Sequence, residues 1–63
     1  MMTDDEIMAE ACSAVRQYRD SAWIYASRRA ERLLAAKDAE GHQGWTRVLA
    51  CIEDIHRIEV SDY

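Results

Sequence analysis

The sequence contains no proline and only two glycines, Gly41 and Gly44. Proline and glycine are the residues least compatible with a helix interior, so helix-breaking signals are confined to one short stretch. Phenylalanine is also absent, and many of the apolar residues are alanines. These absences favour an all-α chain with one thin core between its helices.

Long apolar runs are absent too, and none approaches the roughly 20 residues that a membrane-spanning helix needs. The first residues are acidic, which is the opposite of the basic n-region of a signal peptide. We therefore predict a cytoplasmic protein. In that setting the two cysteines, Cys12 and Cys51, are expected to be buried free thiols rather than a disulfide or metal ligands.

The chain of 63 residues is expected to form a single domain over residues 1–63. A domain of about 60 residues buries only roughly 60% of the surface that its unfolded chain exposes, so its core is marginal. Self-association would remedy this. Charged residues make up 32% of the chain and follow a clear periodicity, which argues against disorder.

Three helices are predicted, over about residues 4–19, 21–37 and 39–59, and residues 60–63 are expected to fray. Thr3 and Glu6 have the spacing of a capping box at the start of the first helix. Asp20 and Ser21 are both N-cap types, and the apolar stripe changes phase after Tyr18. We therefore expect a break there, although a continuous helix remains the alternative.

The second and third predicted helices form a helical hairpin. Asp38 is the expected N-cap of the third helix, and Gly41 and Gly44 are expected to admit a second backbone at close range. The second helix is expected to turn inward Ala22, Trp23, Ala26, Ala30, Leu33 and Leu34. The apolar stripe of the third helix starts at Trp45 and continues through Val48, Leu49, Ile52, Ile55 and Ile58.

Charge is distributed unevenly along the chain. Residues 1–15 carry four acids and no base, residues 16–37 carry six bases and two acids, and residues 38–63 carry six acids and two bases. The middle helix is thus a basic element between two acidic ones. Antiparallel packing or a second subunit would let these charges complement each other.

The pattern of the hairpin resembles a group of short uncharacterised bacterial helical proteins, which share Arg-Ala and Asp-x-x-Gly-x-x-x-Trp elements. The matching residues are Tyr25, Ala26, Arg29, Ala30, Glu31, Asp38, Gly41, Trp45, Val48 and Ile52. The chain departs from the group at Lys37, where the group has glycine, and this departure predicts a less sharply turned helix end. The hairpin is also similar to one tetratricopeptide-type unit, although no internal repeat is present. Neither resemblance implies an activity.

No metal, cofactor or catalytic site is predicted. Cys51 and His56 are five residues apart and point about 140° from each other on a helix, so they cannot share a metal. His42 has no partner at ligand spacing. Both cysteines lie near acidic residues, which disfavour a nucleophilic thiolate. We therefore expect a protein that is not an enzyme.

Binding is the remaining class of function. Three arginines within five residues could contact phosphates, but the net charge of −4 does not favour nucleic acid. Aromatic residues and arginine dominate interface energetics, and an exposed strip through Cys51, Ile55 and Ile58 would mark a contact face. The candidate interaction residues are Trp23, Arg28, Arg29, Arg32, Trp45, Ile52, Ile55 and Ile58.

The leading functional hypothesis is a non-enzymatic protein–protein interaction module that forms a homodimer. The alternative is an acidic inhibitor or nucleic-acid mimic, of the kind that phages and mobile elements encode against host defence nucleases. Nucleic-acid binding through Arg28, Arg29 and Arg32 is the third hypothesis. The acids available for mimicry are Asp4, Asp5, Glu6, Glu10, Glu53, Asp54, Glu59 and Asp62.

Overall fold

The computed structural model describes residues 2–60 of the chain, with side chains up to residue 58. Its elements are the α-helix α1 (Asp4–Tyr18), the short 3₁₀-helix η1 (Arg19–Ser21), and the α-helices α2 (Ala22–Ala35) and α3 (Ala39–Val60). The described residues contain no strand, so the all-α fold class is confirmed. The predicted tail lies outside the described residues, apart from Val60.

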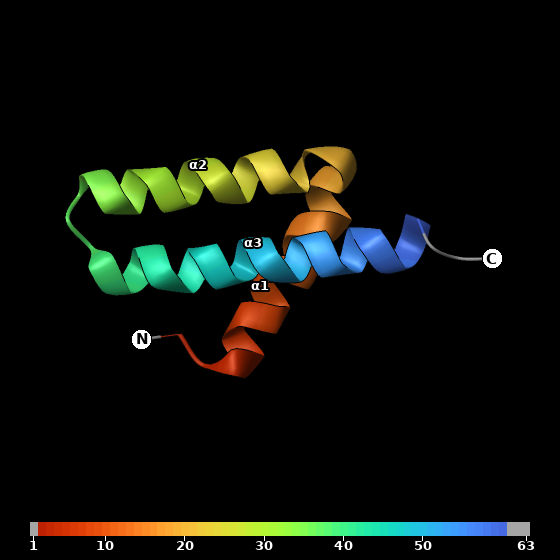
Figure 1. Cartoon of the computed structure of the whole chain (residues 1–63), viewed down its shortest axis with the longest axis horizontal. Helices are drawn as coiled ribbons and strands as arrows, with labels where there is room; N and C mark the ends of the chain where they lie inside the picture. Colours follow the sequence, from red (N-terminus) through yellow and green to blue (C-terminus); the bar gives the residue numbers. More distant parts are fainter. Residues whose placement is uncertain (1, 61–63) are drawn as a thin grey trace.

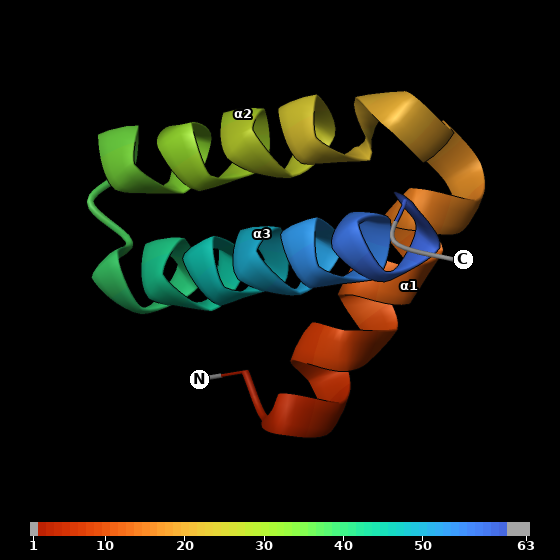
Figure 2. The ribbon, with the colours of Figure 1, turned by 45° about the vertical axis from the view of Figure 1, so that its right-hand side comes forward.

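Helices α2 and α3 lie side by side and run in opposite directions, whereas α1 crosses α3 obliquely (Figures 1 and 2). The molecule is elongated along this hairpin, with extents of 42 × 21 × 16 Å. Helix α1 packs more closely against α3 than against α2. The face of α2 directed away from α3 is therefore largely left to solvent.

The start of α1 is fixed by local hydrogen bonds. The Thr3 hydroxyl accepts a hydrogen bond from the Glu6 amide at 3.2 Å, and a Glu6 carboxylate oxygen accepts one from the Thr3 amide at 2.8 Å. The predicted capping box is therefore confirmed. Two hydrogen bonds with Thr3 lower the pKa of Glu6 below its usual value. The bond from the Thr3 backbone amide contributes most, and the bond with the Thr3 hydroxyl contributes less.

The predicted break near Asp20 is present as η1, but its cause differs from the one expected. Ser21 makes no side-chain capping hydrogen bond to α2. Instead the chain turns at Arg19, whose φ of 51° is rare for a residue with a side chain. This turn changes the direction of the backbone, so that α1 crosses α3 whereas α2 lies alongside α3.

The turn between α2 and α3 is sharp. The Asp38 amide donates to the Leu33 carbonyl at 2.9 Å and the Lys37 amide donates to the Leu34 carbonyl at 3.0 Å, which together form a Schellman motif. Lys37 takes the left-handed conformation, with φ of 62°. The expectation of a less sharply turned end is therefore wrong. The predicted N-cap is confirmed, because Asp38 Oδ1 accepts from the Gly41 amide at 3.0 Å.

Lys37→Gly is expected to raise the free energy of unfolding by about 1 kcal/mol, because glycine avoids the strain of a side chain in the left-handed region. Lys37 is exposed, so few contacts are lost. Urea denaturation followed by circular dichroism measures the change. Lys37→Ala keeps the Cβ atom and is the control, since it should leave the stability near that of the parent chain. Equal stability of the two variants would contradict the strain argument.

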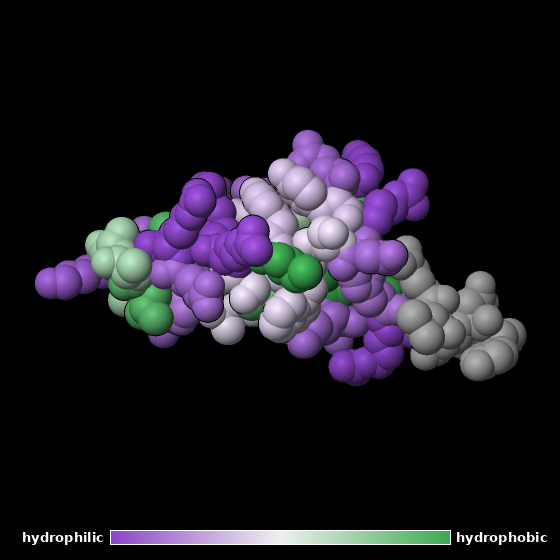
Figure 3. All heavy atoms as spheres, turned by 90° about the horizontal axis from the view of Figure 1, so that it is seen from above, coloured by the Kyte–Doolittle hydropathy of each residue, from purple (hydrophilic) through white to green (hydrophobic). Residues whose placement is uncertain are grey.

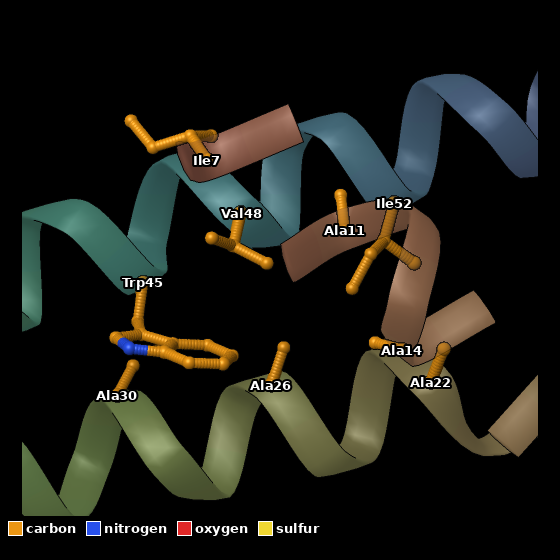
Figure 4. Packing of buried hydrophobic residues seen from close by; sticks show 9 residues of the cluster. All are labelled: Ile7, Ala11, Ala14, Ala22, Ala26, Ala30, Trp45, Val48 and Ile52. Atoms are coloured by element: carbon orange, nitrogen blue, oxygen red, sulfur yellow. The ribbon is translucent and has the colours of Figure 1, made fainter. Parts of the chain in front are cut away.

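The core is thin and rich in alanine. Its nine buried residues include five alanines, and only Ile7, Trp45, Val48 and Ile52 are large. In Figure 4 the Trp45 ring lies over α2, next to Ala26 and Ala30. The small side chains of α2 thus make room for the large ones of α3.

Two predicted core residues are exposed instead. Trp23 and Leu34 keep 43% and 57% of their surface accessible, so their inward placement is wrong. The buried stripe of α2 consists of alanines at steps of four, namely Ala22, Ala26 and Ala30. A large residue adjacent to this stripe is pushed to the flank of the helix contact. There the Trp23 indole nitrogen donates to Glu53 at 3.3 Å.

The glycines do not admit a second backbone, which corrects that expectation. A Cβ atom at Gly44 would meet the Met2 side chain, and one at Gly41 would meet the side chains of Asp38 and Leu33. The hairpin is held together near this end by His42, whose Nδ1 donates to the Ala30 carbonyl at 3.0 Å. The glycines therefore provide room for neighbouring side chains.

Candidate interaction surfaces

Helix α2 and the end of α1 form one hollow of about 380 Å³, which we call the basic–aromatic surface. Six of its seven residues lie on η1 and α2 at steps that repeat every three or four positions, so they share one helix face. Figure 3 looks onto α2 and shows hydrophilic side chains with a hydrophobic one exposed among them. The lining residues are Tyr18, Ser21, Ile24, Tyr25, Arg28, Arg29 and Arg32.

Stacked aromatic rings connect this surface to the core. Tyr18 stacks on Tyr25 with ring centroids 4.5 Å apart, and Tyr25 meets the Trp45 ring edge-on at 5.9 Å. The Arg29 guanidinium lies 5.3 Å from the Trp45 ring centroid, in cation–π geometry. Aromatic contacts of this kind contribute about 0.5–1.5 kcal/mol each beyond the area that they bury. The positions of Tyr18, Tyr25 and Arg29 are therefore supported by contacts within the chain.

Among the described residues, the three arginines of this surface have no carboxylate partner. Among the described residues the ion pairs are Arg47 with Asp4 at 2.6 Å and Arg57 with Asp54 at 3.7 Å. Within the described part of the chain the basic helix therefore forms no ion pair with the acidic helices, and pairing with a second subunit stays a prediction.

A second surface lies where α1 meets α3. We call it the apolar strip and define it as Met8, Cys12, Cys51, Ile55 and Ile58. Met8 and Ile58 keep 51% and 72% of their surface accessible, and Cys51 and Ile55 are half-buried. Met8 and Cys51 line one shallow hollow, and Cys12 and Ile55 line a second. The strip therefore continues from one helix to the other.

The cysteines differ from their predicted environment. Both are free thiols, but Cys12 is exposed and Cys51 is only half-buried, so the prediction of two buried thiols is wrong. Helix α1 turns Ile7, Ala11 and Ala14 toward α3, which leaves Cys12 on the edge of the contact. The Cys12 side chain is therefore part of the apolar strip on the outside of the molecule.

The predicted interaction residues are divided between the core and the surface. Trp45 and Ile52 are buried within the chain, whereas Trp23 and Ile58 are exposed and Ile55 is half-buried. The three arginines are brought together in one hollow.

Sequence reasoning missed the other members of the two surfaces as site residues. On the basic–aromatic surface these are Tyr18, Ser21, Ile24 and Tyr25, and on the apolar strip they are Met8 and Cys12. The α2 residues could have been found, because they precede the arginines at helical spacing. Met8 and Cys12 meet residues more than 30 positions away, and no local pattern reports such a contact.

No group of three or more metal-ligand side chains occurs in the described part of the chain. Over the same residues, no helix has the length and apolar character needed to cross a bilayer. Comparison with known protein families, curated proteins and solved structures finds no match. The resemblance to short bacterial helical proteins therefore stays a prediction, and the functional proposal depends on the surfaces themselves.

Proposed function

We propose that this chain is a non-enzymatic protein–protein interaction module of the cytoplasm, and that it forms a homodimer through the apolar strip. Pairing would complete a small three-helix bundle in each copy with helices from the other. The observation that carries this proposal is the exposure of Met8 and Ile58 beside a core with only four large buried residues.

The energetic argument follows from the thin core. Full burial of a side chain such as Met or Ile contributes about 1.5–3 kcal/mol. A domain of this size has a total stability of the same order as two or three such burials. Covering Met8 and Ile58 with a second copy would therefore add substantially to the stability of the fold.

Charge at the two ends of the strip supports a twofold arrangement. The hollow at Met8 and Cys51 is edged by Asp4, Arg47 and Asp54. The hollow at Cys12 and Ile55 is edged by Arg16 and Arg19. In an antiparallel pairing Asp4 and Asp54, which already pair with Arg47 and Arg57 of their own chain, would also face Arg16 and Arg19 of the other copy, and the twofold axis would repeat this contact.

Ile58→Asp is expected to raise the dissociation constant of the dimer at least about tenfold, because it places a charge in the apolar contact. The residue is exposed in the single chain, so the helix content should not change. Sedimentation equilibrium at several concentrations measures the association. Leu34→Asp, at an exposed apolar residue away from the strip, is the matched control and should leave the dissociation constant unchanged.

Two results would refute self-association through this strip. One is a parent chain that stays monomeric at concentrations of about 100 µM. The other is an equal effect of Ile58→Asp and Leu34→Asp, since a specific contact face must distinguish the two positions.

The second candidate function is the acidic inhibitor or nucleic-acid mimic. It is supported by the exposure of Asp4, Asp5, Glu6 and Glu10 on the first turns of α1. It is weakened by the arginine partners of Asp4 and Asp54, which neutralise part of the acidic surface. Binding of a nuclease that weakens steeply with added salt would favour this candidate, because exposed charge pairs are screened.

A further inference from the structure

We infer that the basic–aromatic surface binds an acidic segment of a partner protein, with an apolar side chain of that segment seated beside Ile24 and Tyr18. This inference deepens the proposed interaction function by naming the chemistry of the partner. It uses the outer face of α2 together with Tyr18 at the end of α1, whereas the proposed dimer uses Met8 and Cys12 of α1 and the strip residues of α3. The two can therefore be tested separately.

The first support is the concentration of unneutralised positive charge. Arg28 and Arg32 are four positions apart on α2, where like charges destabilise a helix by a few tenths of a kcal/mol. The chain contains twelve acids, yet no carboxylate of the described residues lies within ion-pair distance of these arginines. Carboxylates from another molecule would relieve this repulsion and form charge-assisted hydrogen bonds with the guanidinium groups.

The second support is the apolar part of the same hollow. Ile24 is about half exposed, and the Tyr18 ring is exposed while stacked on Tyr25. Interfaces that bind proteins combine aromatic and aliphatic anchors with arginine, and charged residues surround the apolar contact. A segment with a large apolar residue among its acids matches both parts of the hollow.

The third support is preorganisation. Arg29 is held against the Trp45 ring, and Tyr25 is in contact with the same ring. Side chains that already have their bound positions lose less entropy on association. The surface can therefore bind a short segment with Arg29 and the tyrosines already placed.

A short peptide fits this surface better than a nucleic acid. A single strand carries a phosphate at every nucleotide and would bring phosphates near Asp20, which precedes the arginines in the sequence, and near Glu31, which lies between Arg29 and Arg32. The net charge of −4 adds to this repulsion. A peptide can confine its carboxylates to the basic area.

Fluorescence anisotropy tests the inference with a labelled synthetic peptide in which two leucines are flanked by aspartates and glutamates. We expect saturable binding to the parent chain. The double variant Arg28→Glu, Arg32→Glu should lower the affinity for the peptide at least tenfold. The control is the double variant Arg47→Glu, Arg57→Glu, which changes the net charge by the same amount outside this surface. It should alter the affinity less than about twofold. Replacing the leucines of the peptide by serine should also weaken binding.

The inference is overturned if the parent chain does not bind the peptide, if both double variants weaken binding equally, or if a labelled oligothymidylate binds more tightly than the peptide. Circular dichroism of each variant shows whether it is folded, and Ile24→Ser provides an uncharged second test of the hollow. Sedimentation of the same samples separates the two proposals. If the chain is a dimer that does not bind the peptide, only this inference is overturned. If the chain is a monomer that binds the peptide, only the proposal of self-association is overturned.

Discussion

Trp45→Ala is expected to lower the free energy of unfolding by about 3–5 kcal/mol, which is enough to unfold much of the protein at 25 °C. Trp45 is buried, with only 6% of its surface accessible. It contacts Tyr25 edge-on and lies beneath the Arg29 guanidinium. Truncation therefore removes the largest core side chain together with both of these contacts.

The expected loss is large relative to the total stability of the domain. Proteins have roughly 0.05–0.15 kcal/mol of stability per residue, which gives about 3–9 kcal/mol for a chain of this length. Urea denaturation monitored by far-ultraviolet circular dichroism measures the change. A chain that remains as stable as the parent would show that the core does not depend on the indole.

Trp23→Ala is the matched control for this experiment. Trp23 is exposed, and its single hydrogen bond to Glu53 is long at 3.3 Å. We expect a loss below about 1 kcal/mol, since surface substitutions usually have small effects. The two tryptophans should therefore differ in effect although the residue type is the same.

Ala26→Leu is expected to destabilise the protein by about 1–3 kcal/mol, because it adds atoms to a contact that has no room for them. Ala26 is fully buried, and it lies beside the Trp45 ring between α2 and α3 (Figure 4). A leucine there must either push the helices apart or displace the ring. Either change also disturbs Tyr25, which contacts the same ring.

Ala35→Leu is the control for the effect of leucine on α2, because Ala35 is exposed at the end of that helix. Its effect should be within about 0.5 kcal/mol. Thermal and urea unfolding of both variants measure the difference. If Ala26→Leu were as stable as Ala35→Leu, the spacing of α2 and α3 would not be set by alanine.

The starts of α1 and α3 were predictable because their causes are local. The capping box at Thr3 and Glu6 and the N-cap at Asp38 each involve residues three positions apart, so the sequence displays the whole interaction. The turn at Lys37 was not predicted, because its left-handed backbone is stabilised by carbonyls of the preceding helix rather than by a glycine.

The burial of side chains was predictable only in part. The stripe of α3 through Trp45, Val48 and Ile52 has the helical period and is buried as expected. On α2 the alanines Ala22, Ala26 and Ala30 are buried as expected, whereas Trp23 and Leu34, which were predicted to lie inward with them, are exposed. Small residues are buried on this face of α2 because they let the backbones of α2 and α3 come close while the large side chains of α3 fill the space between them.

The sequence by itself determined the all-α class, the caps of α1 and α3 and the position of the arginines on one exposed helix face, because each depends on residues within one or two helical turns. Only the tertiary structure decided which surfaces those residues form. The stacking of Tyr18 on Tyr25 spans the turn at η1, and the apolar strip joins Met8 and Cys12 of α1 to Cys51 and Ile55 of α3. Such contacts depend on the crossing of α1 over α3, which is set by packing in three dimensions and not by any local pattern.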